Sequence, residues 1–182
     1  SLRIIREEKG MDASALFKFS SGLYVVSADP GAGERAAACL VNTGLQVTSA
    51  PLQVSVTVNK ENFTCGAIER AGHFSLAVVD ESADMLFVGR FGFRTSADFD
   101  KYDGIASAVA STGDPYPAEH VCSYVACNVV QTVDVGTHLT FVGEVVDAGN
   151  LSGVPPMTYA YYHTTLKGKT PPKASSYVAG IS

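Results

Sequence analysis

The chain has 182 residues, of which 46% are hydrophobic and 17% are charged, and its net charge is -5. This composition is typical of one folded globular domain with a substantial core, and it excludes an intrinsically disordered chain. The lysines and arginines are scattered, which argues against a nucleic-acid-binding surface. Because no apolar run approaches the roughly 20 residues of a membrane-spanning helix, we expect neither nucleic acid nor a membrane among the partners.

The first ten residues, SLRIIREEKG, contain charges but neither the apolar segment nor the cleavage site of a secretory signal. We interpret Met11 as the natural start, residues 1–10 as an N-terminal extension and residues 11–182 as a single domain. We expect a cytoplasmic protein whose cysteines are reduced. Because the spacing of these cysteines lacks the Cys-x-x-Cys pairs of structural zinc sites, we predict no metal site. The four cysteines are Cys39, Cys65, Cys122 and Cys127.

One segment satisfies the G-x-G-x-x-A pattern of dinucleotide-binding proteins, namely Gly31-Ala32-Gly33-Glu34-Arg35-Ala36. In such proteins the glycines directly follow a strand and open a helix, and an acidic residue lies about 20 positions further on. Here Asp29 and Pro30 intervene, and no acidic residue occurs near Gln53. The segment is therefore interpreted as a turn.

Residues 42–64, NTGLQVTSAPLQVSVTVNKENFT, form the most informative stretch. Two apolar-rich runs at 45–47 and 52–58 flank a turn, and the second run alternates valines with hydroxyl residues as a half-buried strand does. Hydrogen-bonding side chains lie at the ends of this predicted hairpin. They are Asn42, Thr43, Thr48, Ser49, Asn59, Lys60, Asn62 and Thr64. One lysine among short donors suits the phosphate of a cofactor, although an ordinary hairpin with polar turns explains the pattern equally well.

A short helix is predicted at residues 65–71, opening near Thr64 and closing at Gly72. A phosphate bound by Asn62 and Thr64 would then lie at a helix N-terminus, where free N–H groups and the helix dipole favour an anion. This position supports the phosphate interpretation independently of the hairpin pattern.

The remaining segments predict a fold rich in strands. Helices or helical turns are predicted at 12–20, 84–88 and 98–102, and loops at 91–96 and 113–117. Strands are predicted at 22–27, 73–79, 121–133, 136–146 and 157–163, and residues 36–41 lead into the central hairpin. The basic, proline-rich segment 167–177 is predicted to be an ordered arm or loop. Recurring strands with few short helices indicate an antiparallel barrel or sandwich.

Several segments together resemble the FMN-binding split-barrel flavin reductases, within the branch of flavoredoxins, archaeal-type ferric reductases and rubredoxin-linked flavin reductases. The resembling segments are LFKFSSGLYVVS (16–27), NTGLQVTSAP (42–51), VNKENFT (58–64), VGRFGFRTSADFDKYDG (88–104), VDVGTHLTFVGEVVDA (133–148), MTYAYYH (157–163) and KGKTPPKASSY (167–177). The resemblance implies an all-β, six-stranded antiparallel Greek-key split barrel. It also implies a homodimer with one FMN per subunit near the interface.

The resemblance also assigns roles to residues. It implies flavin ring and ribityl contacts at Asn42, Thr43, Gln46, Val47, Thr48 and Ser49, phosphate contacts at Asn59, Lys60, Asn62 and Thr64, and further contacts at Phe91 and Arg94. An ion pair with Asp98 is the alternative for Arg94. His138 matches a family histidine on the side of the flavin where nicotinamide stacks. His163 carries a weaker signal for the same cleft, whereas His73 and His120 are interpreted as structural.

The implied function is an oxidoreductase that takes hydride from NADH or NADPH onto bound FMN. Electrons would pass to free flavin, to iron or to a small redox protein such as rubredoxin. A flavoredoxin-like electron carrier reduced by a partner protein, and a non-catalytic flavin-binding protein, are the alternatives. Two departures from the family weaken the iron-linked reading: Cys39 stands at a commonly polar position, and Thr57 stands where some relatives carry a thiol.

Overall fold

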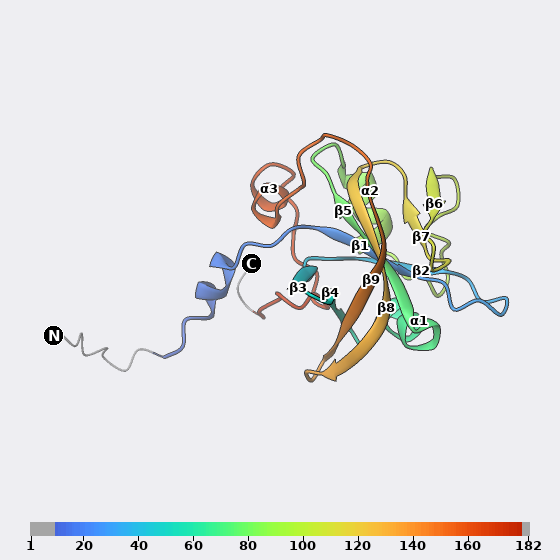
Figure 1. The fold of residues 1–182 in the computed structure, drawn as a ribbon. Helices are drawn as coiled ribbons and strands as arrows, with labels where there is room; N and C mark the ends of the chain where they lie inside the picture. The colour runs from blue at the N-terminus through green and yellow to red at the C-terminus, as the bar shows by residue number, and fades with distance from the viewer. Residues whose placement is uncertain (1–9, 180–182) are drawn as a thin grey trace.

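The computed structural model describes residues 10–179, and an antiparallel sheet dominates these residues (Figure 1). The strands of this sheet are β1 (Tyr24–Ala28), β2 (Ala37–Val41), β3 (Leu45–Ser49), β4 (Leu52–Asn59), β5 (His73–Val79), β8 (Val121–Asp134) and β9 (His138–Asn150). They lie in the order β2-β1-β5-β8-β9-β4-β3. The predicted antiparallel split-barrel class is confirmed. With the short edge strand β3 counted, the sheet has seven strands in the described residues instead of the six expected.

The shorter elements lie around this sheet, and the one nearest the N-terminus stands apart from it (Figure 1). They are the 3₁₀ helix η1 (Ala13–Lys18), the helices α1 (Phe63–Ala71), α2 (Met85–Gly92) and α3 (Tyr159–Thr164), and the hairpin of β6 (Ser107–Val109) with β7 (Pro115–Pro117). None of the helices in residues 10–179 is long and apolar enough to cross a membrane.

Two hydrophobic clusters lie on opposite faces of the sheet, as alternation along β1 shows. Val26 packs with Val56, Phe74 and Phe141 in the cluster that α1 also enters. The adjacent Val25 packs into the other cluster, which contains α2 and α3 residues. Because successive side chains of a strand point to opposite faces, strands β1, β2, β5 and β8 contribute to both clusters. Only the first cluster reaches the strand β4 that ends in the predicted phosphate segment.

The helix α1 forms where its capping residues predict it. The Asn62 side chain accepts a hydrogen bond from the Thr64 N–H at the N-terminus. At the other end Gly72 has a φ of +72°, a left-handed conformation that glycine adopts without steric cost, and its N–H donates to the Ile68 carbonyl. The helix begins two residues before the predicted start at 65, at Phe63.

Three predictions for the second half of the chain are wrong in detail. Residues 157–163 do not form a strand, because Thr158 caps α3 by accepting from the Tyr161 N–H, and the helix continues to Thr164. The loop predicted at 91–96 begins inside α2, which extends to Gly92. The loop predicted at 113–117 contains β7, so the hairpin β6–β7 was not predicted, whereas segment 98–102 contains turns, in keeping with the helical turn expected there. Tyrosines favour strands in general, but a local cap decides the outcome at α3.

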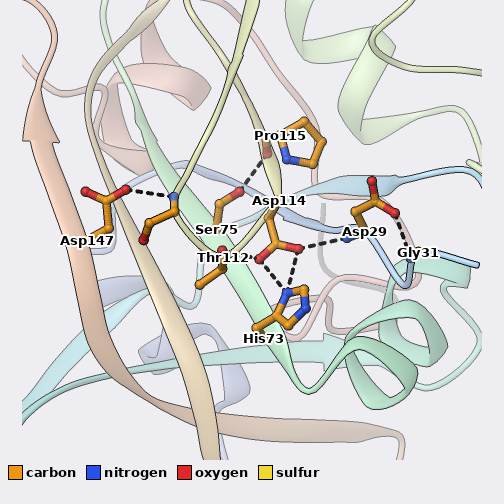
Figure 2. Close-up of polar contacts among 9 residues, drawn as sticks. Asp29, Gly31, His73, Ser75, Thr112, Asp114, Pro115 and Asp147 are labelled. Carbon is orange, nitrogen blue, oxygen red and sulfur yellow. Dashed lines mark hydrogen bonds and ion pairs between the residues drawn. The ribbon is translucent and has the colours of Figure 1, made fainter.

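A buried aspartate ties the β6–β7 connection to the sheet (Figure 2). Asp114 is fully buried and accepts hydrogen bonds from the Asp29 N–H at 2.8 Å and the Thr112 hydroxyl at 2.6 Å. His73 Nδ1 lies 2.9 Å from Oδ1, which accepts from Asp29, and 2.8 Å from Oδ2, which accepts from Thr112. A buried carboxylate with this many partners fixes the loops that it joins. His73 is therefore structural, as predicted, and the Gly31-Ala32-Gly33 segment is a turn before β2, as predicted.

Candidate functional site

A cavity of about 640 Å³ lies between the ends of β2 and β4, the C-terminal end of α2 and the C-terminal arm, residues 167–177. We call it the arm-covered cavity. Five predicted site residues line it: Asn42, Asn59, Asn62, Arg94 and His138. Lining residues that were not predicted as contacts include Cys39, Thr57, Phe93, Tyr159, Tyr162 and Lys173. Its volume lies in the range of roughly 300 to 1,000 Å³ that small-molecule and cofactor sites occupy.

The wall formed by β4 and β9 carries His138. Asn59 and His138 are direct partners across the two strands, so both side chains stand at the same end of the sheet. His138 is 9% exposed, and its Nδ1 lies 2.8 Å from the Thr137 hydroxyl. This contact leaves Nε2 as the ring nitrogen available for a ligand. The structure thus brings the predicted histidine to the predicted cavity.

Thr43 supports this wall from behind instead of lining the cavity. Its hydroxyl donates to the Thr57 carbonyl at 2.7 Å and accepts from the Thr57 N–H at 3.1 Å. The Thr57 side chain in turn bonds the Thr140 hydroxyl at 2.7 Å. Thr43 therefore holds β4 in place, a role in which its side chain has no free donor for a cofactor.

The N-terminus of α1 forms the end of the cavity where an anion is expected. Asn62 lines the cavity and caps the helix. The Thr64 side chain is completely buried, and its hydroxyl has no hydrogen-bond partner among the described residues. A buried hydroxyl without a partner costs roughly 1 to 3 kcal/mol. Thr64 does not itself line the cavity, and the N–H groups of Thr64 and Cys65 already donate to Asn62. The Thr64 hydroxyl is therefore a donor at the positive end of the α1 dipole that is still without a partner in the described part of the chain.

Cys39 and Lys101 are two buried groups near this end. Burial raises the pKa of the Cys39 thiol, and Lys101, Thr64 and Asn62 partly oppose that rise. Burial lowers the pKa of Lys101 to about 8, an effect that the Cys39 thiolate would oppose. The Lys101 ammonium donates to the Phe91 carbonyl at 2.8 Å. The cavity therefore has a protonated thiol in its wall and a buried cation behind it.

The C-terminal arm is held over the cavity by the side chains predicted to bind the cofactor. Asn42 donates to the Ser176 hydroxyl at 2.9 Å and accepts from the Ser175 hydroxyl at 3.3 Å. Asn59 donates to the Lys173 carbonyl at 3.1 Å. Figure 1 shows this last part of the chain returning beside β3 and β4. The predicted arm is confirmed as an ordered cover with no part in the hydrophobic clusters.

The root of the arm is packed tightly against α3. A Cβ atom on Gly168 would lie 2.0 Å from Cζ of Tyr162, so only glycine allows this approach. The Tyr162 hydroxyl donates to the Lys169 carbonyl at 3.1 Å, and the His163 Nδ1–H donates to the Gly168 carbonyl at 2.8 Å. His163 therefore anchors the arm, and it does not line the cavity.

Several predicted contacts lie outside the cavity. The β3 residues Gln46, Val47, Thr48 and Ser49 do not line it. Both oxygens of Asp134 accept from the Lys60 ammonium at 2.7 Å, so this cation is already paired. Asp134 lies on β8, 74 positions from Lys60, so the sequence around Lys60 could not predict this ion pair.

Phe91 is corrected by the structure as a cofactor contact. Its ring is completely buried in the hydrophobic cluster that contains α2 and α3 residues. The centroid of this ring lies 5.0 Å from that of Phe87 and 5.7 Å from that of Tyr102. Continuation of α2 to Gly92 turns Phe91 inward, and Phe93, which is 54% exposed, lines the cavity instead. A loop prediction at 91–96 could not distinguish the two aromatic residues.

Arg94 lines the cavity beside Phe93. Its guanidinium lies over the Phe99 ring, 4.2 Å from the ring centroid. Within the described residues it makes no ion pair with Asp98, the alternative that its position allowed. An arginine that stacks on a ring and has no carboxylate partner keeps its donors free for a phosphate.

Comparisons with known proteins identify the family of the chain. Residues 16–169 match the flavin reductase-like domain family. The chain is 42% identical to a ferric-chelate reductase (NAD(P)H) of Archaeoglobus fulgidus over 92% of this chain and 98% of that one. It is 38% identical to a high molecular weight rubredoxin of Moorella thermoacetica, over 93% of this chain and 73% of that one.

A solved structure supports the fold. The flavoredoxin of Methanosarcina acetivorans superposes with a TM-score of 0.68 at 21% identity, covering 82% of this chain and 81% of that one. The sequence and the structure thus both match flavin reductase-like proteins over most of the chain. The chain belongs to the flavin reductase-like family of oxidoreductases.

Proposed function

We propose that the protein holds one FMN in the arm-covered cavity, reduces it with NAD(P)H and passes the electrons to free flavin, to ferric iron or to a small redox protein. The observation that supports this proposal best is the set of three amide side chains and Arg94 that lines one cavity at the N-terminus of α1, where the buried Thr64 hydroxyl behind the lining has no partner among the described residues. This donor set matches a phosphate better than it matches a neutral ligand.

The phosphate end of the proposed site combines neutral donors with cations. Asn59, Asn62 and Thr64 would supply directed hydrogen bonds, and Arg94 would supply the balancing charge. Lys60 would join them only by leaving Asp134, and because that ion pair is exposed, the exchange costs little. Lys173 of the arm lines the cavity and pairs with Glu61 at 3.0 Å, so it is a second exchangeable cation.

The ring end of the proposed site lies toward β4, β9 and α3. FMN supplies the redox chemistry, since it accepts a hydride and releases electrons singly or in pairs. The chain's own residues would position the rings and keep water away. Thr57 and His138 form the polar wall there, with Tyr159 and Tyr162 on the arm side. We expect His138 to orient a bound ring through Nε2 instead of acting as an obligatory acid.

We further propose a homodimer that completes the site. The β3–β4 hairpin exposes a group of apolar side chains: Leu45 at 63%, Val47 at 46% and Leu52 at 45%. Adjacent apolar residues exposed to this degree on an edge hairpin are typical of an interaction surface. Pairing there would bury the 46–49 segment and bring its backbone donors into an enclosed site, as the family resemblance implies.

The proposed electron acceptors follow from the names of the relatives. The Archaeoglobus fulgidus relative is named as a ferric-chelate reductase, and the Moorella thermoacetica relative as a rubredoxin. A small redox protein as a separate partner would suit a chain that contains no Cys-x-x-Cys pair. Thr57 in place of a thiol makes the protein partner the better candidate of the two.

Anaerobic mixing tests the proposed function. Protein loaded with FMN is mixed with NADH and, separately, with NADPH, and the visible flavin absorbance is followed by stopped flow. Rapid bleaching by either nucleotide is expected. Retained FMN without bleaching by either nucleotide would favour a flavoredoxin-like carrier, an alternative consistent with the arm that covers the cavity. Failure to take up FMN would refute the proposal altogether.

A further inference from the structure

A second cavity, of about 940 Å³, lies on the other side of the α2 C-terminus from the arm-covered cavity. We call it the α2 cavity. It is lined by α2, by residues around 99–106 and by residues 117–120. Phe93 and Arg94 line both cavities, so the two spaces meet at these side chains. One elongated ligand that passes over Phe93 and Arg94 would therefore contact both.

The inner part of the α2 cavity is aromatic and cationic. Arg94 lies 4.2 Å and Arg90 5.4 Å from the centroid of the Phe99 ring. Arg90 Nη1 donates to the carbonyls of Lys101 at 3.2 Å and Asp103 at 2.9 Å, so its position is fixed. Arg94 makes no hydrogen bond or ion pair within residues 10–179. Because Arg94 is assigned to the flavin phosphate, the guanidinium that suits a diphosphate in the α2 cavity is that of Arg90, whose Nε and Nη2 donate to no group among the described residues.

Another part of the α2 cavity carries a carboxylate. Glu119 is exposed, lines the cavity and makes no hydrogen bond or ion pair with the described part of the chain. The other acid of the lining, Asp84, caps α2 by accepting from the Phe87 N–H at 2.9 Å. Glu119 is thus the acid that is free to accept hydrogen bonds from a ligand's hydroxyl groups.

We infer that the α2 cavity binds the adenosine diphosphate part of the nicotinamide dinucleotide, with Arg90 at the diphosphate and Glu119 at the adenosine ribose. This inference rests on the proposed function, because the nicotinamide would reach the flavin in the arm-covered cavity. A carboxylate accepts hydrogen bonds from a ribose 2′-hydroxyl and repels a 2′-phosphate. The cavity therefore selects NADH over NADPH.

The kinetic test compares three hydride donors: NADH, NADPH and reduced nicotinamide mononucleotide, which lacks the adenosine part. With FMN-loaded wild type, kcat/KM for NADH should exceed that for NADPH by about tenfold or more, the scale of discrimination by a single charged contact. Glu119→Arg should lower this ratio about tenfold and leave the mononucleotide unaffected. Glu69→Arg is the matched control, because Glu69 is an exposed glutamate of α1 that lines neither cavity.

A binding experiment separates this inference from the proposed function. ADP-ribose, which carries no hydride, is titrated calorimetrically into FMN-loaded wild type, Glu119→Arg and Glu69→Arg. Phosphorylation of the ribose 2′-hydroxyl should weaken binding to wild type and not to Glu119→Arg. If no donor reduces the flavin but ADP-ribose binds with this dependence, the proposed reaction is wrong and the cavity assignment stands. The inference is overturned if Glu119→Arg and Glu69→Arg behave alike, or if the mononucleotide reacts as well as NADH.

Discussion

Freeing the C-terminal arm is expected to tighten FMN binding. If Asn42 and Asn59 bind the flavin, they must first give up the arm, because the arm occupies their donors and acceptors in this structure. The double variant Ser175→Ala with Ser176→Ala removes both arm contacts of Asn42 and leaves the Asn59 contact in place. Each substitution removes only a hydroxyl group, so it enlarges no side chain and introduces no charge.

The expected magnitude follows from these hydrogen bonds. Each contributes about 0.5 to 1.5 kcal/mol net, and the longer one, at 3.3 Å between exposed groups, lies at the low end. We expect a total of about 1 to 2 kcal/mol, which corresponds to a 5- to 30-fold fall in the FMN dissociation constant. The ion pair between Lys173 and Glu61 adds little, because both side chains are more than 60% exposed.

Quenching of FMN fluorescence during titration measures this constant for wild type and for the double variant. Ser107→Ala, at an exposed β6 position outside the arm-covered cavity, is the control and should leave it unchanged. An unchanged or weakened affinity in the double variant would refute the reasoning. It would mean that the arm closes over the flavin without competing for Asn42.

Three further predictions concern stability. Between pH 7 and pH 9.5, the free energy of urea unfolding of wild type should rise by about 2 kcal/mol relative to that of Lys101→Met. Burial lowers the folded-state pKa of Lys101 to about 8, so the buried ammonium destabilises the fold fully below pH 8, and this cost is relieved as pH rises toward the ordinary pKa. Equal pH profiles of the two proteins would contradict this. Asn62→Ala should lower the free energy of unfolding by about 1 kcal/mol through loss of the α1 cap, and an unchanged urea midpoint would show that the cap is dispensable. Gly168→Ala should displace the arm from Tyr162 and make the peptide bonds after residue 168 sensitive to limited proteolysis, whereas a wild-type digestion pattern would count against the tight packing.

Local signals predicted the fold where they agreed with the tertiary context. Alternation in residues 52–58 predicted β4, and the stop residue Gly72 predicted the end of α1, whose cap is Asn62 and whose start was expected near Thr64. The strand prediction at 157–163 was wrong because three tyrosines favour a strand, whereas Thr158 caps a helix there. The hairpin β6–β7 was not predicted because each strand has only three residues and the hairpin depends on the buried Asp114 nearby.

The site was predicted in part. Asn42, Asn59, Asn62, Arg94 and His138 meet at one cavity, as the resemblance implied. The competing contacts were beyond local sequence, because they join segments more than 70 residues apart: the arm to Asn42, and Asp134 to Lys60. The basic, proline-rich composition of the tail was the available signal for the arm, but it did not show what the arm covers.

The central claim is that the N-terminus of α1 binds the phosphate of a flavin. The most direct measurement compares the affinities of FMN and riboflavin, which differ only in that phosphate, for wild type and for Thr64→Val. The account predicts that wild type binds FMN at least about 100-fold more tightly, and that the variant reduces this ratio about tenfold or more while the flavin-free protein loses no stability. Equal affinities of wild type for FMN and riboflavin, or the same ratio in both proteins, would contradict it.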